Sequence, residues 1–203
     1  MNTLYNKPLI KKILKTNGHK NYMSFKYIFT SYNVDVESKI SLKGGHMRRK
    51  DKEIENRDLI EQIIAKAQVC RLGLSNNNQP YIVPVSYGYD GTFIYFHTAV
   101  EGTKIDYMST NPQICFELEH DVKIITNDSL ACKWTHSFYS VIGFGTVQEI
   151  KDHQHKVKAF NQIMMHYSDK EWNFDEEMLN KTRVWQITIE QVTGKKSKDK
   201  ITI

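Results

Sequence analysis

Apolar residues recur at helical spacing in two segments of the chain. Between residues 56 and 68 they fall three and four positions apart, which predicts one amphipathic helix with Asn56 as its N-cap. A second helix is predicted over 152–168, where one side would be formed by Val157, Phe160, Ile163 and Met164. Shorter helical segments are expected at 102–112 and 176–182.

Six further segments are rich in β-branched and aromatic residues and predict strands. They are 70–75, 79–90, 92–99, 113–126, 137–152 and 184–196. Pro80 and Pro84 lie in the second segment, and proline cannot donate a ladder hydrogen bond. We therefore expect this strand at an edge of the sheet or with an interruption. The pair Asp90-Gly91 predicts a hairpin into the following strand.

The order of these elements favours a mainly β fold. The strands follow one another through hairpins, the helices are few and short, and no regular strand–helix alternation is present. Gly143 and Gly145 predict a bulge or a close backbone approach within a long strand, and residues 127–136 are predicted as a loop. A small antiparallel β-barrel with peripheral helices is therefore expected rather than a doubly wound sheet.

The positive charge of the chain is concentrated in its N-terminal segment. The 203 residues carry a net charge of +5, whereas residues 1–46, with eight lysines and two acids, carry +6 and leave −1 for the remainder. Nucleic-acid binding is therefore not expected of that remainder. No apolar run approaches the ~18 residues of a membrane span. Three widely spaced cysteines without a CxxC pair are typical of reduced thiols in a cytoplasmic protein.

Residues 1–46 end in a sequence with a second interpretation. Lys-Gly-Gly-His-Met at 43–47 can be encoded by AAA-GGA-GGA-CAU-AUG, a purine-rich ribosome-binding sequence followed by a start codon. We hypothesise that native translation begins at Met47, with 1–46 a translated leader and 47–203 the folded domain. The alternative is a genuine lysine-rich extension. An intact native mass that includes residues 1–46 would exclude the first interpretation.

The stretch YFHTAVEGTK (95–104) joins a strand to a potential anion site. A helix that opens at Gly102 would present free N–H groups and its positive dipole end to a phosphate, and Lys104 would add a charge-assisted contact. Gly and Lys are also ordinary residues at a helix start, and the spacing is not that of a P-loop. His97 has no second metal ligand at suitable spacing, so an acid–base group or a pocket wall is the better interpretation.

Three other features carry less information. The Gly143-x-Gly145 pair lacks the third glycine of a dinucleotide fingerprint. Cys115 and Cys132 have no local group that would activate a thiol. Trp134 and Trp185 have the shape to stack on a planar ligand, or to pack in the core or a dimer interface.

Several motifs, taken in order, resemble those of one family. They are MRRKDKEI, CRLGL, QPYIVPVSYGYD, IYFHTAVEGTKID, NPQICF, SVIGFGTV and W-x-I-x-I-x-x-x-T-G-K-K. Across 47–196 the chain resembles the pyridoxamine 5′-phosphate oxidase-like FMN-binding split-barrel proteins, specifically the branch related to nitroimidazole-resistance (Nim) proteins. The resemblance implies a six-stranded antiparallel split barrel that forms a homodimer with FMN at the subunit interface.

The resemblance also implies which residues contact FMN. Lys104, which follows Gly102, matches the residue that holds the phosphate, and Ser140 and Trp185 are candidates for the second subunit's side of the pocket. Arg71 would lie near the phosphate or form a surface salt bridge. His97 is the candidate catalytic residue, at the substrate side or the flavin edge. Positions along the isoalloxazine and ribityl chain are matched by Val83, Val85, His97, Thr98 and Ala99.

The implied function is electron transfer through FMN. NAD(P)H or another reductant would supply the electrons, and a nitroaromatic, nitroimidazole or quinone would accept them. The alternative is a flavin- or haem-binding carrier or sensor without turnover, because the fold serves both. Oxidation of a phosphorylated B6 vitamer is not expected. The chain has five arginines, and its end, TGKKSKDKITI, lacks the R-L-x-P motif of the true oxidases.

Overall fold

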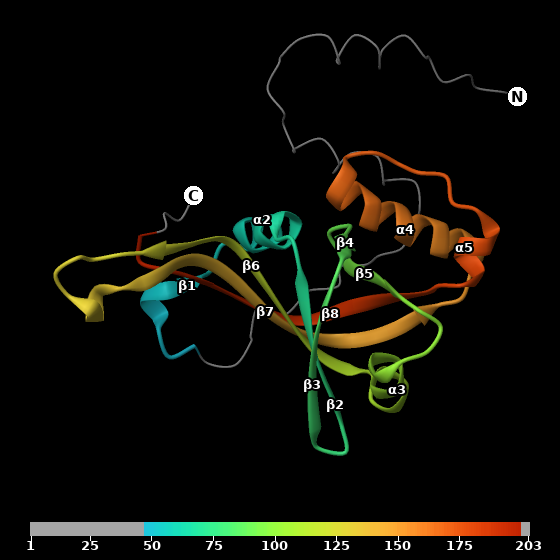
Figure 1. Ribbon diagram of the computed structural model, residues 1–203, viewed down its shortest axis with the longest axis horizontal. Helices are drawn as coiled ribbons and strands as arrows, with labels where there is room; N and C mark the ends of the chain where they lie inside the picture. Colours follow the sequence, from blue (N-terminus) through green and yellow to red (C-terminus); the bar gives the residue numbers. More distant parts are fainter. Residues whose placement is uncertain (1–46, 200–203) are drawn as a thin grey trace, which may run out of the picture. The chain divides into compact units, whose positions relative to one another are not determined.

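The computed structural model describes residues 47–199, which fold around an eight-stranded antiparallel sheet (Figure 1). The strand order is β3-β2-β6-β7-β8-β5-β4, and β1 pairs with β8. The strands are β1 (Glu53–Ile54), β2 (Cys70–Asn76), β3 (Gln79–Val85), β4 (Tyr87–Tyr89), β5 (Phe93–Thr98), β6 (Gln113–Ile125), β7 (Thr135–Ile150) and β8 (Arg183–Lys196). The prediction for residues 1–46 lies outside the described residues.

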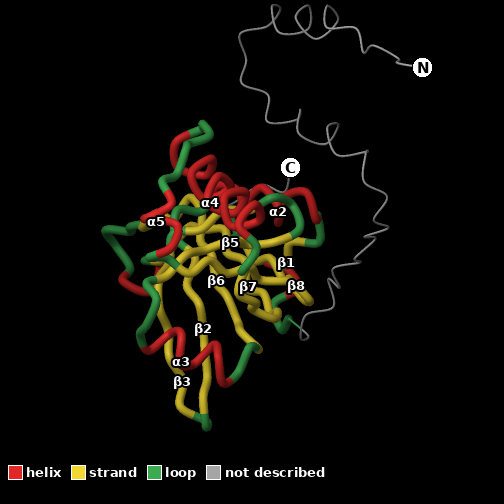
Figure 2. Tube along the Cα trace, turned by 90° about the vertical axis from the view of Figure 1, so that its right-hand side faces the viewer, coloured by secondary structure: helices red, strands yellow, loops and turns green. Residues whose placement is uncertain are grey.

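Within residues 47–199, four α-helices accompany the sheet. They are α2 (Arg57–Lys66), α3 (Thr103–Thr110), α4 (His153–Ser168) and α5 (Glu176–Asn180), and single 3₁₀ turns span Lys50–Lys52 and Ala131–Lys133. Figure 2 shows α2, α4 and α5 over one end of the curled sheet, with α3 beside the β2–β3 hairpin. Side-chain caps fix three of the helix starts, because Asn56, Asp152 and Asp175 each accept a backbone N–H from the first turn.

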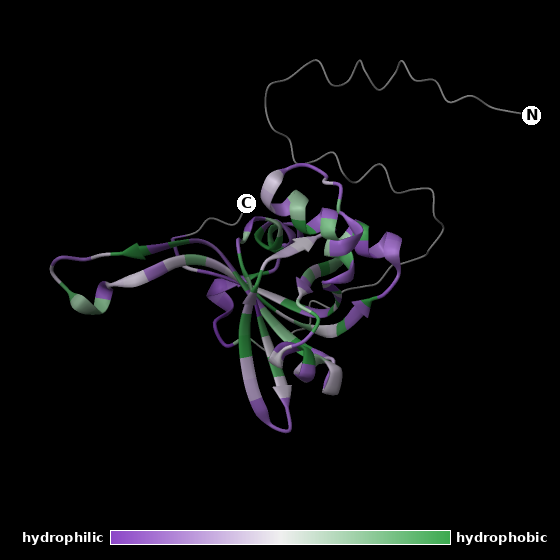
Figure 3. Cartoon of the chain, turned by 45° about the vertical axis from the view of Figure 1, so that its right-hand side comes forward, coloured by the Kyte–Doolittle hydropathy of each residue, from purple (hydrophilic) through white to green (hydrophobic). Residues whose placement is uncertain are grey.

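The core follows from the alternation of apolar residues along the strands. Side chains on the inner face are fully buried and pack with the apolar side of α2, whereas the tip of the β2–β3 hairpin is hydrophilic (Figure 3). A second, smaller cluster lies between the sheet and the helices α4 and α5. Its buried members are Tyr95, Ile150, Ala159, Phe160, Ile163, Leu179 and Val184.

The mainly β, antiparallel fold predicted from the sequence is confirmed, and each predicted strand and helix is present. The segment 79–90 is interrupted at Ser86, which divides it into β3 and β4, and β3 lies at the end of the strand order as its prolines predicted. The register between β7 and β8 shifts between Phe144 and Gly145, where the glycines predicted a bulge. The additional strand β1 was not predicted.

The loop prediction for 127–136 was partly wrong. Thr135 and His136 already belong to β7, because they pair with Ile125 and Ile124 beyond a register shift in the β6–β7 ladder. This pairing extends the β6–β7 hairpin past the other strands (Figure 1). Local polarity suggested a loop, whereas pairing with the partner strand decided the backbone conformation.

Helix α4 lies in direct backbone contact with β4. A Cβ atom at Gly88 would stand 2.3 Å from the carbonyl carbon of Gln162, so only glycine permits this approach. The contact places α4 over the outer face of β4 and β5, and this face includes His97. Among the described residues, no helix has the length and apolarity required to cross a membrane.

Candidate functional site

Residues 95–104, which the sequence predicted as a strand followed by an anion site, form the junction between β5 and α3. Gly102 is the N-cap of α3 and has φ 136°, a conformation that side-chain-bearing residues rarely adopt. Its carbonyl accepts the N–H groups of Ile105 and Asp106, which leaves the first N–H groups of the helix available. Lys104 forms no ion pair within residues 47–199. The junction thus presents positive charge and free donors together.

His97 lies on the opposite face of β5 from Phe96 and Thr98. Its ring centroid is 5.5 Å from that of Phe160 on α4, with the planes inclined by 41°. Partial burial of the imidazole, and secondarily the positive charge of Lys104, lower the pKa of His97, although the residue as a whole is exposed. The imidazole is therefore neutral at neutral pH, with one nitrogen able to donate and the other able to accept a hydrogen bond. Within residues 47–199, no three His, Cys, Asp or Glu side chains gather as a metal site.

Thr98 and Trp185 meet on the inner face of the sheet. Trp185 Nε1 donates to Thr98 Oγ1 at 3.1 Å, and the Thr98 hydroxyl donates to the carbonyl of Ala99 at 2.7 Å. The Trp185 indole also stacks on Phe96, with ring planes 12° apart and centroids 6.4 Å apart. These bonds fix the hydroxyl and the backbone turn at the point where β5 ends.

An ion pair that the sequence did not reveal lies next to Trp185. The Arg183 guanidinium stands 4.7 Å from the Trp185 ring centroid and binds Glu149 through two hydrogen bonds of 2.8 and 2.6 Å. Alternation along β8 places Arg183 and Trp185 on one face, which was a usable signal. Glu149 was not predictable, because its approach depends on the register of β7 against β8.

A surface groove of about 680 Å³ adjoins this ion pair. Its walls come from α3, the end of β7, the start of α4 and the start of β8, and they include Ser109, Gln148, Glu149, Arg183 and Trp185. The volume lies within the usual range for small-molecule sites. The groove and the β5–α3 junction are linked through the Trp185–Thr98 hydrogen bond.

The Arg183–Glu149 pair makes stability pH-dependent. The hydrogen bonds from Arg183 hold the pKa of Glu149 below its ordinary value, so its stabilisation is complete above about pH 4.3 and is lost as the pH falls through the lowered pKa. We expect Glu149→Gln to cost about 1 kcal/mol at pH 7. Urea unfolding of both proteins at pH 7 and below pH 4 checks this. The difference in unfolding free energy between wild type and Glu149→Gln should shrink at acid pH. The exposed Glu171→Gln serves as the control and should not change stability. A difference that stays constant with pH would contradict the assignment.

Of the remaining predicted site residues, Val83 and Val85 pack in the same core cluster as Trp185, whereas Ser140 lies far from it within one chain. Val83 and Val85 turn from β3 toward the barrel core, where Val85 is buried. Ser140 pairs with Lys195, and Trp185 pairs with Glu149 nine residues further along β7, a separation of roughly 30 Å at about 3.3 Å per residue. Their contribution to a cofactor site across two subunits stays a prediction.

Arg71 follows the second of its two predicted roles. Its guanidinium lies 3.0 Å from Glu117 and 3.4 Å from Glu119, both on the neighbouring strand β6. Cys115 is half-buried on the same strand, and burial raises the pKa of its thiol, so nothing in its surroundings activates it.

The fold and these contacts define a split-barrel protein, and comparison with known proteins identifies its family. A family model described as pyridoxamine 5′-phosphate oxidase matches residues 56–196. The chain therefore belongs to the pyridoxamine 5′-phosphate oxidase family. It is also 31% identical over 65 residues to an uncharacterized protein of Rhizobium meliloti, of which this match spans 42%.

Solved structures agree with this assignment. A candidate 5-nitroimidazole antibiotic resistance protein from Bacteroides thetaiotaomicron is 29% identical and superposes with a TM-score of 0.63, covering 70% of this chain and 85% of that protein. The flavocytochrome Anf3 of Azotobacter vinelandii gives a TM-score of 0.64 at 16% identity, over 75% of this chain and 72% of that one. The FAD and heme binding protein of Mycobacterium smegmatis superposes with a TM-score of 0.64 at 13% identity. This match covers 72% of this chain and 73% of that protein. The predicted resemblance to the split-barrel family and its nitroimidazole-resistance-related branch is confirmed.

Proposed function

We propose that the protein binds FMN and passes electrons from NAD(P)H or another reductant to a small acceptor such as a nitroaromatic compound or a quinone. The observation that carries this proposal is the β5–α3 junction. There the uncompensated Lys104, the free N–H groups of α3 and the neutral His97 lie within one short stretch. An anionic cofactor with a redox-active ring would use each of these features.

The residues at the junction fit the phosphate end of FMN. A helix N-terminus favours an anion, and a lysine without an acidic partner adds a charge-assisted hydrogen bond. Gly102 contributes open space, since among the described residues no heavy atom beyond Gly102 and its two chain neighbours lies within 4 Å of where its Cβ would stand. Thr98 and Ala99 are small, so the backbone beside them can lie close to the ribityl chain.

Each of these residues has a distinct task in the proposed reaction. FMN, when bound, supplies the redox chemistry by accepting a hydride or electrons and releasing them to the acceptor. Lys104 and the first turn of α3 hold the phosphate, and the Trp185–Thr98 bond keeps the end of β5 in place. His97, neutral near pH 7, offers a hydrogen-bond donor or acceptor to the acceptor molecule.

A second copy of the chain would complete the pocket. Ser140 and Trp185 lie far apart in one chain, so a homodimer with FMN at its interface is part of the proposal. Oxidation of a phosphorylated B6 vitamer is not, although the family carries that name. The last strand ends at Lys196 in TGKK without the arginine motif of those enzymes.

The absorption spectrum of the purified protein tests the proposal. We expect a yellow protein, or one that takes up FMN on titration, whose flavin absorbance is bleached by NADH or NADPH in the absence of oxygen. Admission of a nitroaromatic acceptor should then restore the absorbance. A protein that takes up no FMN would refute the proposal, and a bound flavin that no nicotinamide donor reduces would instead indicate a carrier or sensor.

A further inference from the structure

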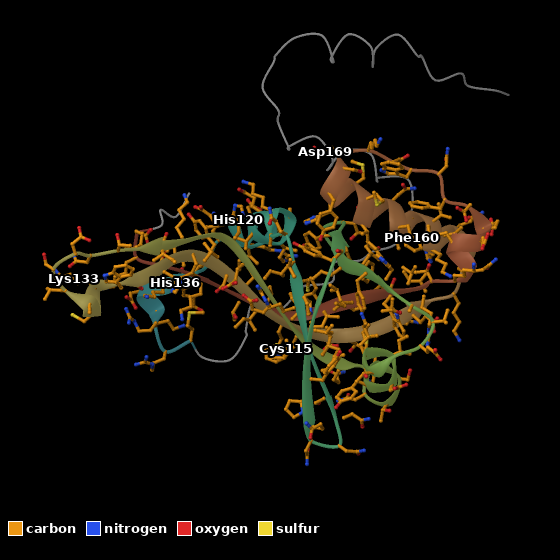
Figure 4. All side chains as sticks on the ribbon, in the orientation of Figure 1. Cys115, His120, Lys133, His136, Phe160 and Asp169 are labelled. Carbon is orange, nitrogen blue, oxygen red and sulfur yellow. The ribbon has the colours of Figure 1, made fainter. Side chains whose placement is uncertain are left out.

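His97 is an exposed residue whose imidazole contacts one aromatic ring from outside the sheet, and a second ring packs behind the first. Phe160 of α4 stands 5.5 Å from the imidazole, and Phe174 stands 5.2 Å from Phe160, measured between ring centroids. Phe160 is only 5% exposed and belongs to the cluster between the sheet and α4 (Figure 4). Aromatic rings at these separations attract one another beyond the effect of burial alone.

The position of α4 is set by contacts that do not involve His97. Gly88 admits the helix backbone directly onto β4. Near the other end of α4, the Tyr167 hydroxyl accepts the N–H of Tyr87 at 3.1 Å and donates to the carbonyl of Gln68 at 2.9 Å. His166 Nε2 lies 2.8 Å from the carbonyl of Ala67. Phe160 is therefore held over β5 whether or not His97 is present.

The second ring is fixed in the same way. The segment after α4 is tied back to the helix, because the Trp172 N–H donates to Asn161 Oδ1 at 2.8 Å and Trp172 Nε1 donates to Ser168 Oγ at 2.9 Å. This holds the segment that carries Phe174 against Phe160. Residues whose rotamers are locked by their own neighbours are suited to orient a functional side chain.

The charges around His97 are unequal on its two sides. Among the described residues, Lys104 of α3 is the one charged group that shifts the pKa of His97, whereas α4 and β8 face it with Phe160 and the buried Val184. The imidazole thus lies between an apolar wall and the cation assigned to the phosphate.

We propose that Phe160, backed by Phe174, is a positioning residue that holds the His97 imidazole in one orientation beside the flavin site. The role of His97 at that site rests on the proposed function; the contact itself does not. Helix α4, together with β5, then restricts the plane in which the His97 imidazole faces an acceptor. Substitutions in α4 would change reactivity without touching cofactor or substrate.

NMR titration of His97 in the purified full-length chain, without added FMN, tests this proposal. The variants are Phe160→Leu, Phe174→Leu and, as a matched control in the same cluster, Ile163→Val, with His97→Gln to assign the resonance. In Phe160→Leu we expect the pKa of His97 to rise, because desolvation of the ring is relieved. Its Hε1 resonance should also lose the ring-current shift. Phe174→Leu should give a smaller change of the same sign, and Ile163→Val none.

Unchanged pKa and Hε1 shift in a folded Phe160→Leu would overturn the proposal, as would equal changes in Ile163→Val. If Phe160→Leu does not fold, Phe174→Leu decides, and no change there would also overturn it. A separate FMN titration of the wild-type chain distinguishes failure of the proposed function from failure of the proposed role of Phe160. Failure to take up FMN would refute the proposed function, whereas the titration of His97 would still decide whether Phe160 positions the ring.

Discussion

Lys104→Ala is expected to weaken FMN binding by about tenfold to a hundredfold, since one charge-assisted contact contributes about 1.5–3 kcal/mol. Lys104 forms no ion pair within residues 47–199, so its loss leaves no buried acid unpaired. The melting temperature of the apoprotein should therefore hardly change. Fluorescence titration with FMN at two salt concentrations measures the affinity, and the affinity of the wild type should fall more steeply with salt than that of the variant.

Two further lysine variants make this test specific. Lys104→Arg keeps the charge and should retain most of the affinity. Lys133→Ala removes an equally exposed charge from the 3₁₀ turn between β6 and β7 and should leave FMN binding unaltered. Equal affinity of Lys104→Ala and wild type would show that Lys104 is an ordinary surface lysine and that the phosphate lies elsewhere.

Gly88→Ala is expected to destabilise the protein by about 3 kcal/mol, because the added methyl group would overlap the backbone of α4. A Cβ there would lie 2.3 Å from the Gln162 carbonyl carbon and 2.5 Å from the Ile163 nitrogen. Both are backbone atoms of a helix, so they cannot relieve the overlap by a rotamer change as a flexible side chain could. For a domain of this size the melting temperature should fall by roughly 6–12 °C. Thermal unfolding followed by circular dichroism measures the effect.

A second glycine provides the control. At Gly73 on β2, an added Cβ would meet Cys115 at 3.6 Å, an ordinary van der Waals distance. Gly73→Ala should therefore be close to neutral or slightly stabilising, since alanine loses less chain entropy on folding. Similar melting temperatures for the two alanine variants would mean that α4 does not pack on β4 as closely as the structure has it.

Gly88 shows which features of the fold can be predicted from local sequence patterns and which depend on tertiary packing. The segment 79–90 is identified as strand-forming from its β-branched and aromatic residues, and Asp90-Gly91 as a hairpin turn from its chemistry. Gly88 carries no such signal, because its importance comes from a helix 74 residues further along the chain. Periodicity predicts a single helix or strand, whereas the close packing of a helix on a strand depends on both elements.

The candidate site likewise contains residues that the sequence could identify and residues that only the packing of the chain reveals. His97, Gly102 and Lys104 could be named from one continuous stretch, because a strand end and a helix start are adjacent in sequence and in space. Thr98 and Ala99 were named as cofactor contacts through the family resemblance. Phe160 was assigned from the sequence only to one side of a predicted helix, and Arg183 and Glu149 were not singled out. Each of them reaches the site through strand register or helix docking, which a linear pattern does not encode.

Motif resemblance thus indicates the split-barrel family, and local sequence patterns predict the antiparallel β class, the elements in order and the strand-to-helix junction with its lysine. These local predictions depend on side-chain alternation, turn residues and capping, all of which act over a few residues. Tertiary packing is what makes His97 face α4 while Thr98 faces the barrel interior beside Trp185. Those contacts are long-range, since they require β5, β8 and α4 to pack together before the side chains can meet.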